Sequence, residues 1–589
     1  MNDHGLKHDA RETTAAAAGV RARLRRFLAT RTTRYALGAV FAGFLIAAES
    51  DLDSLPFTFL IAALIATFFY ALSARPVFAL FMMTSLMTLS TFVSMAKRKF
   101  LGMNAHVFDV WFYLAKPDTL LFLGDEFRFL TIAALAAVAA FIGLAIVVYR
   151  FDQEVPLRRV MAGGAAMGCI AITPVALPWE ADNLSYHNRK YHFASSFFVS
   201  LSDIPRLLRT DPVSIRLAGI QPQPPFLASL ECKPLAAAPD IILTLSESAV
   251  PPAAIPGWRF DASLQDYFKS FDGEVHRARV ETHGGGTWVT HTSVTSGLSM
   301  ADFGWMRPYA TMLLRDRLHH GLPAALEKCG YRTAVISPQS YNFVNEGPML
   351  TSLGFRDYID RSTLNAPTKH EADAFYFGKA LDFYQRHLED DRRPLFLFVI
   401  TMAAHSPYDF RFKPERHARG EPFGNDAQTD EYLRRLTFAQ EDYAAFVEHL
   451  RRLNRPALAV QFGDHHPLMT RASFEAAGQP QQMSDWRSRL FETFYAVTPV
   501  NFTPAAPLPK VAVLDFAYLG ATLIDVAGLP LDAVFEDKLA LRALCEGAFH
   551  TCADRSAVDR HLARMSAAGL LVDPGRPPAT SQTAQRDQP

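Results

Sequence analysis

Three side chains that could ligate a metal ion follow two short apolar runs of the sequence. Glu247 comes just after Ile241–Leu245, and Asp464 and His465 follow Ala457–Phe462 in the stretch Gln-Phe-Gly-Asp-His-His-Pro. Two carboxylates and one imidazole suit a single divalent ion with mixed oxygen and nitrogen ligands, Mn²⁺ or Zn²⁺, with Mg²⁺ as an alternative. The simpler interpretations are a helix-capping Glu247 and a structural Asp-His turn.

A hydroxyl group stands at the expected start of a helix. The run Gly284–Gly286 leads into Thr287, which Trp288 and a helical pattern follow. Backbone N–H groups and the helix dipole favour an anion at such a position. Thr287 is therefore a candidate nucleophile. Thr290 and Ser293 are rival hydroxyls, and Thr287 as a plain turn residue is the simpler interpretation.

The predicted strands and helices alternate along the chain, so the candidate site residues that follow strands are expected at one edge of a common sheet. Buried strands are predicted at Ile241–Leu245, Thr333–Ile336, Leu395–Thr401, Ala457–Phe462 and Thr493–Val497, and helices at Leu322–Cys329, Ala372–Glu389 and Glu431–Leu453. This order predicts an α/β domain with a mainly parallel central sheet and helices on both faces. Ligands bind beyond the carboxyl ends of such strands, where Glu247, His405 and Asp464 stand.

Composition excludes two classes of protein. The 589 residues hold 59 Lys+Arg and 59 Asp+Glu, so the chain lacks the basic excess that a nucleic-acid binder usually carries. Aromatic residues make up 12%, which argues against a disordered chain.

The first third of the sequence is predicted to be a membrane domain. Apolar stretches that could cross a bilayer as helices are Tyr35–Ala48, Ser54–Ala74, Pro76–Ala96, Phe129–Tyr149 and Val160–Trp179. The tail Met1–Arg34 is basic and lacks a cleavable signal peptide pattern, so it is expected in the cytoplasm. Five spans then place the rest of the chain on the periplasmic or extracytoplasmic side. The cluster Lys97–Lys99 is a candidate contact for anionic lipid headgroups, with ordinary interfacial anchoring as the alternative.

Five segments follow from these patterns. They are a cytoplasmic tail (1–34), a transmembrane domain (35–180), an interfacial helix and Pro-rich linker (181–239), a catalytic domain (240–531) and a C-terminal extension with a disordered tail (532–589). Cys545 and Cys552 are close enough in sequence to pair in an oxidising compartment.

The motifs together resemble a known family. Glu-Ser, Gly-Gly-Gly-Thr, Ala-His-Ser-Pro-Tyr and Phe-Gly-Asp-His-His-Pro occur in the order seen in the lipoteichoic acid synthase/phosphoglycerol transferase branch of the sulfatase-like alkaline phosphatase superfamily. The resemblance implies a sulfatase-like fold, with Glu247, Asp464 and His465 binding the metal. It also implies that Thr287 is both nucleophile and ligand, and that His405 contacts the substrate or leaving group.

The sequence departs from the family where the substrate would bind. Ser337 stands where a His is expected, and Asn345-Glu346 replaces an Asn-Arg pair. One hypothesis is that Glu346 faces the ammonium of a phosphoethanolamine head group; the alternative is that it faces solvent. His466 either points to the site or merely precedes a proline.

Several other polar residues near the motifs are predicted to have supporting roles. Arg307, Arg361 or Lys369 could supply the missing positive charge, and His283 and His291 are interpreted as local supporting groups. Asn345, Glu346, His405 and His466 complete the predicted substrate-binding set.

The predicted function is transfer of a phospholipid head group through a covalent phosphothreonine to a glycan or lipid acceptor outside the cytoplasmic membrane. The head group is phosphoglycerol, or alternatively phosphoethanolamine, so the donor is phosphatidylglycerol or phosphatidylethanolamine. A phosphate or sulfate ester hydrolase and a catalytically degenerate membrane scaffold are the alternatives. The oligomeric state is not predicted.

Overall fold

The computed structural model describes ten stretches of the chain. They are residues 31–49, 54–101, 103–115, 117–126, 128–155, 159–176, 192–226, 238–368, 370–483 and 485–572. Most of the predicted basic tail, most of the Pro-rich linker and the predicted disordered tail lie outside these residues. The chain divides into two compact units, one formed mainly by the residues up to Ile204 and the other mainly by Pro205 onward.

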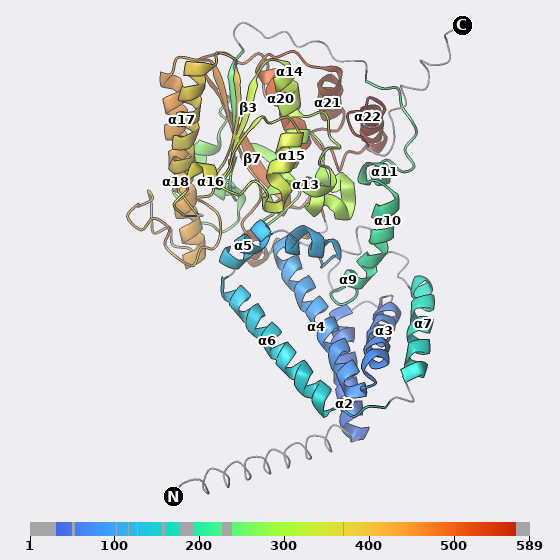
Figure 1. Cartoon of the computed structure of the whole chain (residues 1–589). Coiled ribbons are helices and arrows are strands. Elements are labelled where there is room, and N and C mark those ends of the chain that lie inside the picture. The colour runs from blue at the N-terminus through green and yellow to red at the C-terminus, as the bar shows by residue number, and fades with distance from the viewer. Residues whose placement is uncertain are drawn as a thin grey trace, which may run out of the picture. The chain divides into compact units, whose positions relative to one another are not determined.

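Helices occupy all five apolar stretches of the first unit (Figure 1). They are α2 (Arg31–Glu49), α3 (Leu55–Ser73), α4 (Pro76–Leu101), α6 (Arg128–Phe151) and α7 (Arg159–Ala176). Three helical segments are long and apolar enough to cross a membrane: Leu55–Ser73, Pro76–Lys99 and Thr131–Phe151. Gly38–Glu49 and Arg159–Thr173 are shorter apolar helices.

Buried polar contacts tie the ends of these helices together. Glu49 accepts hydrogen bonds from Ser54 Oγ at 2.8 Å and from Ser195 N at 2.6 Å. Lys97, one of the residues predicted to meet lipid headgroups, forms a salt bridge with Asp109 at 2.7 Å. Six short helical segments lie between α4 and α6 or follow α7. They are η1 (Val110–Leu114), α5 (Pro117–Glu126), α9 (Ser196–Val199), η3 (Ser200–Ser202), α10 (Asp203–Arg209) and α11 (Pro212–Arg216).

An eight-stranded sheet forms the centre of the second unit, in the order β4-β3-β5-β1-β6-β7-β2-β8. The strands are β1 (Asp240–Ser246), β2 (His276–Arg279), β3 (Arg332–Ile336), β4 (Asp357–Ile359), β5 (Leu395–Ile400), β6 (Ala457–Gly463), β7 (Glu492–Val500) and β8 (Leu514–Asp515). Strands β4, β3, β5, β1 and β6 are mutually parallel, whereas β7 runs antiparallel to β6 and β2. The mainly parallel sheet and its five predicted strands are confirmed.

Helices cover both faces of this sheet (Figure 1). On one face α17 (Asp373–Asp390) and α18 (Ala427–Arg452) pack against β1, β3, β5 and β6 through an apolar cluster that includes Ile242, Phe377 and Phe446. On the other face lie α14 (Leu322–Lys328), α15 (Glu346–Ser352) and α20 (Leu519–Val526). The remaining helical segments are η4 (Pro252–Ala254), η5 (Ala262–Phe268), α12 (Thr287–Ser296), η6 (Met300–Tyr309), α13 (Ala310–Leu313), η7 (Phe343–Asn345), α16 (Arg361–Leu364), α19 (Thr470–Ala476), η8 (Arg489–Phe491), η9 (Phe516–Tyr518), α21 (Ala533–Leu544) and α22 (Arg555–Ala567).

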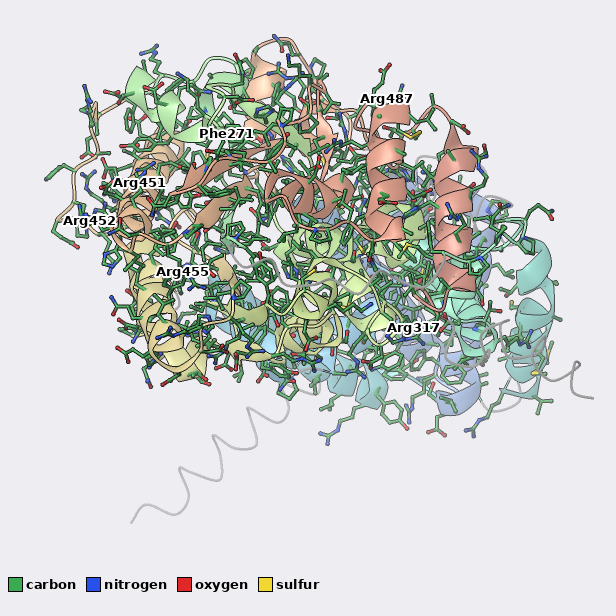
Figure 2. All side chains as sticks on the ribbon, turned by 90° about the horizontal axis from the view of Figure 1, so that it is seen from above. Phe271, Arg317, Arg451, Arg452, Arg455 and Arg487 are labelled. Carbon is green, nitrogen blue, oxygen red and sulfur yellow. A yellow bond between two sulfur atoms is a disulfide. The ribbon has the colours of Figure 1, made fainter. Side chains whose placement is uncertain are left out.

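Helix α18 is the longest helix of this unit's described part and has complementary ends. At its N-terminus the Asp426 side chain accepts hydrogen bonds from the backbone N–H groups of Gln428 and Thr429. Its last turn carries Arg451 and Arg452, which lie at the periphery of the molecule (Figure 2). A carboxylate cap and a basic last turn both oppose the helix dipole, which explains why this pattern persists as one helix.

The segment after residue 531 adds two helices, α21 and α22, to the second unit. Cys545 and Cys552 form a disulfide between α21 and α22, as the sequence suggested. Lys538 is buried in α21 and donates a hydrogen bond to the carbonyl of Gly297, the residue that ends α12. A cation at a helix C-terminus is favourable, so Lys538 of this segment stabilises the C-terminal end of α12.

Candidate functional site

Glu247 and Asp464 lie next to each other because of strand register. β1 and β6 are parallel neighbours in which Ser246 pairs with Gly463, so the next residue of each strand emerges at the same edge. Gly463 is required there, since a Cβ atom would lie 1.9 Å from the carbonyl oxygen of Ala249. The two carboxylates are thus placed together by the pairing itself.

His465 completes a buried group that could hold a metal ion. Ligand atoms of Glu247, Asp464 and His465 all lie within 4.8 Å of one another. His465 Nε2 is 3.2 Å from Asp464 Oδ2 and 3.5 Å from Glu247 Oε1. Its other nitrogen, Nδ1, lies 3.1 Å from the carbonyl oxygen of His466, the contact that usually leaves Nε2 unprotonated for a metal.

Two atoms of this group lack hydrogen bonds to the described residues, which fits a role as ligands of a cation. Asp464 Oδ2 and His465 Nε2 are buried and have no hydrogen-bond partner among the described residues. Buried polar atoms are nearly always paired, so unpaired atoms that face each other need an explanation. A divalent ion between them satisfies both, and the oxygen–nitrogen donor set suits Mn²⁺ or Zn²⁺.

The two buried carboxylates of this group also repel each other. Burial, reinforced by the neighbouring Asp464 carboxylate, raises the pKa of Glu247 to about 8. Ser248 stabilises both carboxylates through hydrogen bonds. Its hydroxyl donates to Glu247 Oε1 at 2.9 Å, and its N–H donates to Asp464 Oδ1 at 2.7 Å. The sequence contained no signal for this role of Ser248.

Thr287 is the hydroxyl that reaches this group of Glu247, Asp464 and His465. It is the first residue of α12, and Gly286 before it has a φ of 86°, which favours glycine. Its Oγ1 donates a hydrogen bond to Glu247 Oε2 at 3.2 Å. The rival hydroxyls are used elsewhere: Thr290 donates to the Asp464 carbonyl and Ser293 donates to Glu281.

The two histidines beside the motifs have structural partners. His466 Nε2 lies 2.6 Å from the Glu492 carbonyl and Nδ1 lies 3.2 Å from Thr470 Oγ1, so both ring nitrogens are engaged inside the fold. Burial lowers the pKa of His466 to about 4 and that of His283 well below its usual value, so both rings are neutral. The predicted contact of His466 with a substrate stays a prediction.

Glu346 is buried rather than exposed, so the solvent-facing alternative is wrong. Its carboxylate lies 3.2 Å from His291 Nε2 and accepts hydrogen bonds from Ser337 at 2.8 Å and Tyr358 at 2.6 Å. Burial alone would raise its pKa, but these contacts, led by His291, lower the pKa of Glu346 instead. Its predicted contact with a head group stays a prediction.

The other predicted substrate residues lie on neighbouring segments. Asn345 is buried and its amide donates to the Thr311 carbonyl at 2.6 Å. His405 follows β5 in a segment without regular structure that runs to α18, and its carbonyl accepts a hydrogen bond from Arg435 at 2.9 Å. Arg361 begins α16, whereas Lys369 lies outside the described residues.

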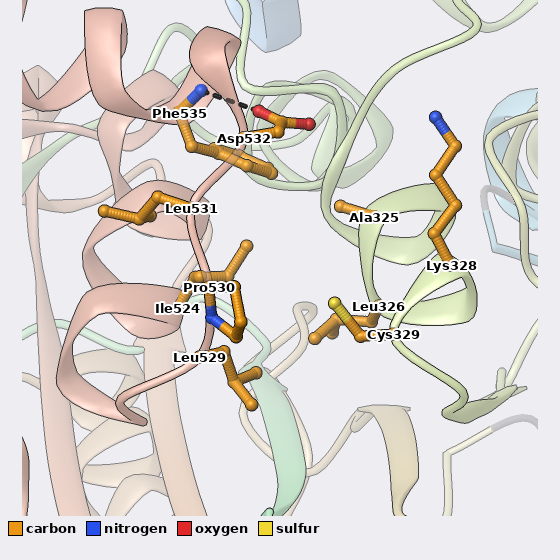
Figure 3. A pocket seen from close by; sticks show the side chains of 10 residues that line it. All are labelled: Ala325, Leu326, Lys328, Cys329, Ile524, Leu529, Pro530, Leu531, Asp532 and Phe535. Atoms are coloured by element: carbon orange, nitrogen blue, oxygen red, sulfur yellow. Dashed lines mark hydrogen bonds between the residues drawn. The ribbon is translucent and has the colours of Figure 1, made fainter. Parts of the chain in front are cut away.

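A small pocket elsewhere contains none of these residues (Figure 3). It lies between α14 and the segment that joins α20 to α21, lined by side chains such as Ala325, Leu529 and Phe535. Its lining is mostly apolar, with Lys328 and Asp532 as its charged residues.

Comparison with a family model assigns the α/β unit. Residues 277–488 match the model described as Sulfatase, a range that includes Thr287, His405, Asp464 and His465 and begins after Glu247. This part of the α/β unit is therefore similar to the sulfatase/alkaline phosphatase superfamily, and the match does not distinguish its branches.

Two curated relatives match part of the chain. An uncharacterized protein of Haemophilus influenzae is 23% identical over 330 residues, which is 54% of this chain and 58% of that protein. The capsular polysaccharide biosynthesis protein RkpI of Rhizobium meliloti is 26% identical over 190 residues, which is 32% of this chain and 33% of that protein. The chain thus spans a little over half of the first relative's length and a third of the second's.

Two solved structures are also similar. The Streptococcus pyogenes phosphoglycerol transferase GacH, in complex with sn-glycerol-1-phosphate, is 17% identical, covers 62% of this chain and 91% of its own, and has a TM-score of 0.45. The lipooligosaccharide phosphoethanolamine transferase A of Neisseria meningitidis is 13% identical, covers 83% of this chain and 95% of its own, and has a TM-score of 0.44.

Proposed function

We propose that this chain is a membrane-anchored, metal-dependent phosphotransferase that moves a phospholipid head group onto an acceptor outside the cytoplasmic membrane. One observation carries the proposal: the hydroxyl at the start of α12 donates to Glu247 beside two unpaired ligand atoms of Asp464 and His465. A hydroxyl held against a metal-ligating group is the arrangement that an activated nucleophile requires.

The chemistry assigns a task to each residue. Glu247, Asp464 and His465 hold the ion, which when bound activates a hydroxyl and neutralises charge on phosphoryl oxygens. The Thr287 oxygen attacks phosphorus, the bond to the diacylglycerol oxygen breaks, and diacylglycerol leaves with the proton that Thr287 gave up. An acceptor hydroxyl then attacks the phosphothreonine, and Thr287 regains a proton. His405 is proposed to contact the substrate or leaving group.

The substrates are proposed from the membrane helices and the relatives. A lipid donor, phosphatidylglycerol or phosphatidylethanolamine, suits a chain with three candidate spans. A glycan acceptor is supported by the match to a capsular polysaccharide biosynthesis protein over 32% of the chain. Five spans and a cytoplasmic N-terminus, with the catalytic unit periplasmic or extracytoplasmic, complete the proposal.

The test is mass spectrometry of the peptide that contains residue 287, after incubation of the full chain with Mn²⁺ or Zn²⁺ and each labelled phospholipid. We expect an adduct on Thr287 whose mass identifies the head group. Thr287→Val should abolish adduct and turnover, whereas Thr292→Val should leave both, because the Thr292 hydroxyl bonds only within α12.

The alternatives predict other results. Release of free head group without an acceptor, at the rate seen with one, would indicate a hydrolase. No adduct and no turnover with either lipid or metal would indicate a degenerate scaffold.

A further inference from the structure

Arg307 is a buried cation to which the described part of the chain gives no anionic partner in contact. It lies in η6 and is 8% exposed. Its guanidinium carbon lies 4.6 Å from the centroid of the Trp486 ring, and its side chain forms no hydrogen bond or ion pair with any described residue. Burial lowers the pKa of Arg307 to about 10, so the group stays charged at neutral pH. A buried charge without a hydrogen-bonded counter-ion is strongly unfavourable.

Two other buried arginines show how this fold normally satisfies such a group. Arg434 and Arg435 on α18 share the carboxylate of Glu431, at 2.9 and 2.7 Å. Both also donate to backbone carbonyls, Arg435 to those of His405 and Phe410 at 2.9 Å each. The isolation of Arg307 is therefore not a general property of buried arginines in this protein.

The carboxylate whose charge acts on Arg307 is already engaged. Glu281 accepts hydrogen bonds from Ser293 Oγ at 2.7 Å and Met300 N at 2.9 Å, and also from the Ser299 hydroxyl. It attracts the guanidinium without bonding to it. The donors of Arg307 therefore remain available to a ligand.

The position of Arg307 connects it to the nucleophile. The carbonyl of Pro308, the next residue, accepts a hydrogen bond from Trp288 Nε1 at 2.8 Å. Trp288 directly follows Thr287 in the first turn of α12. Arg307 thus belongs to the segment packed against the turn that presents the proposed nucleophile.

We propose that Arg307 is an anion-binding residue of this site, which takes an oxyanion of the substrate while Trp486 holds the guanidinium plane. The inference rests on the proposed phosphotransferase function and names the group that binds the donor phosphate. A guanidinium fork matches phosphate oxygens in two parallel hydrogen bonds.

The test measures binding of inorganic phosphate to the full chain in detergent with Zn²⁺, by isothermal titration calorimetry. Arg307→Met should weaken binding about tenfold or more, since charge-assisted hydrogen bonds are lost. The phosphate affinity of Arg307→Lys should lie between those of the wild type and Arg307→Met, because the lysine ammonium is a point charge without the two parallel donors of the guanidinium. The control is Arg487→Met, which removes an exposed charge next to Trp486 at the periphery of the molecule (Figure 2).

Thermal unfolding without phosphate separates a binding role from a structural one. Removing an unpaired buried cation should leave the unfolding midpoint of Arg307→Met equal to or above that of the wild type. A lower midpoint, phosphate affinity equal to wild type, or no phosphate binding by the wild type would each overturn the proposal. Arg307-dependent phosphate binding without any head-group transfer would count against the proposed function alone.

Turnover then identifies the source of the oxyanion. If it is the donor phosphate, Arg307→Met slows diacylglycerol release from labelled lipid in the absence of an acceptor. A defect that arises only when an acceptor is added would assign the oxyanion to the acceptor.

Discussion

At the scale of single residues, a proton and a metal ion compete for Glu247. Burial and the Asp464 carboxylate raise the pKa of Glu247 to about 8, so without a metal this group is mostly protonated at neutral pH. Metal binding must release that proton. We therefore expect the affinity for Zn²⁺ or Mn²⁺ to rise with pH up to about 8, by as much as about tenfold per pH unit. Competition with a chelator between pH 6 and 8 measures this slope.

A matched variant isolates the source of the slope. Glu247→Gln keeps the shape but cannot release a proton, so its weaker affinity should depend much less on pH. The same slope in both proteins would show that another group controls metal binding.

Glu346 gives a prediction about stability rather than catalysis. Its carboxylate is shared by His291, Ser337 and Tyr358, which come from three different elements. Glu346→Arg would set a cation against these donors and should cost about 3–5 kcal/mol in the free energy of unfolding. Glu346→Gln keeps an acceptor oxygen and should cost about 1–3 kcal/mol. Denaturant unfolding of both variants checks the order, and a stable Glu346→Arg protein would contradict it.

The contrast between these residues shows what the sequence could predict. Glu247, Asp464 and Thr287 each follow a strand or a glycine run, so local pattern and strand order are enough to bring them together. Glu346 and Arg307 depend on partners separated by many residues, and no local pattern records whether such partners exist. The burial of Glu346 and the isolation of Arg307 therefore appear only in three dimensions.

At the scale of elements, α18 holds the loops on both sides of the site. Tyr432 donates to the Ser248 carbonyl at 2.9 Å, next to Glu247. One turn further on, Arg435 donates to the His405 carbonyl at 2.9 Å and pairs with Glu431 at 2.7 Å. One rigid helix thus sets the distance between the two loops.

This arrangement predicts coupling between Arg435 and His405. Arg435→Met should slow head-group transfer and cost about 3–5 kcal/mol of stability, because it leaves a buried carboxylate with one partner fewer. If Arg435 acts by positioning His405, its effect on transfer should largely disappear in the His405→Ala background. Arg434→Met is the control, since Arg434 bonds the carbonyls of Phe412, Lys413 and Arg416 and not that of His405. Additive effects of Arg435→Met and His405→Ala would contradict the positioning role.

The elements that the sequence did not predict are short or polar. β2 has the sequence His-Arg-Ala-Arg, and β4 and β8 hold three and two residues. These segments are strands because β2 pairs with β7, β4 with β3 and β8 with β2. The β propensity of a short segment does not indicate whether such a neighbouring strand exists. The helices after residue 531 belong with the catalytic unit for a similar reason, since the buried contact of Lys538 with Gly297 spans more than two hundred residues.

At the scale of the whole molecule, contacts between helix ends limit how often the chain can cross a membrane. Glu49 accepts hydrogen bonds from the backbone of Ala194 at 3.0 Å and Ser195 at 2.6 Å, so these segments lie on one side. Between them the described chain passes through α3, α4, α6 and α7, and also through η1 and α5, which at five and ten residues are too short to cross. An even number of crossings is required. Three crossings, by α3, α4 and α6 alone, would put the partners on opposite sides.

A second pair of contacts gives the same parity. The N–H of Val107 donates to Ser200 Oγ at 2.8 Å, and His106 Nε2 lies 3.0 Å from Asp203. Among the described residues, the helices between these positions are α6, α7 and the short segments η1, α5 and α9, which hold five, ten and four residues and are too short to cross. Because α6 is a candidate span, we predict that α7 also crosses, although its apolar part is short. At 18 residues and about 1.5 Å per residue, α7 is about 27 Å long, close to the thickness of a bilayer core.

Cysteine labelling tests this parity. Gln153, in the exposed turn after α6, and Arg487, in the catalytic unit, should lie on opposite sides of the membrane if α7 crosses. In a Cys169→Ala background, a membrane-impermeant maleimide applied to intact spheroplasts should label Arg487→Cys and leave Gln153→Cys unlabelled until the membrane is opened. Labelling of both in intact spheroplasts would show that α7 does not cross, whichever way the chain is oriented. Labelling of Gln153→Cys alone would keep the parity and reverse the proposed orientation, which would also place the site away from any acceptor outside the membrane.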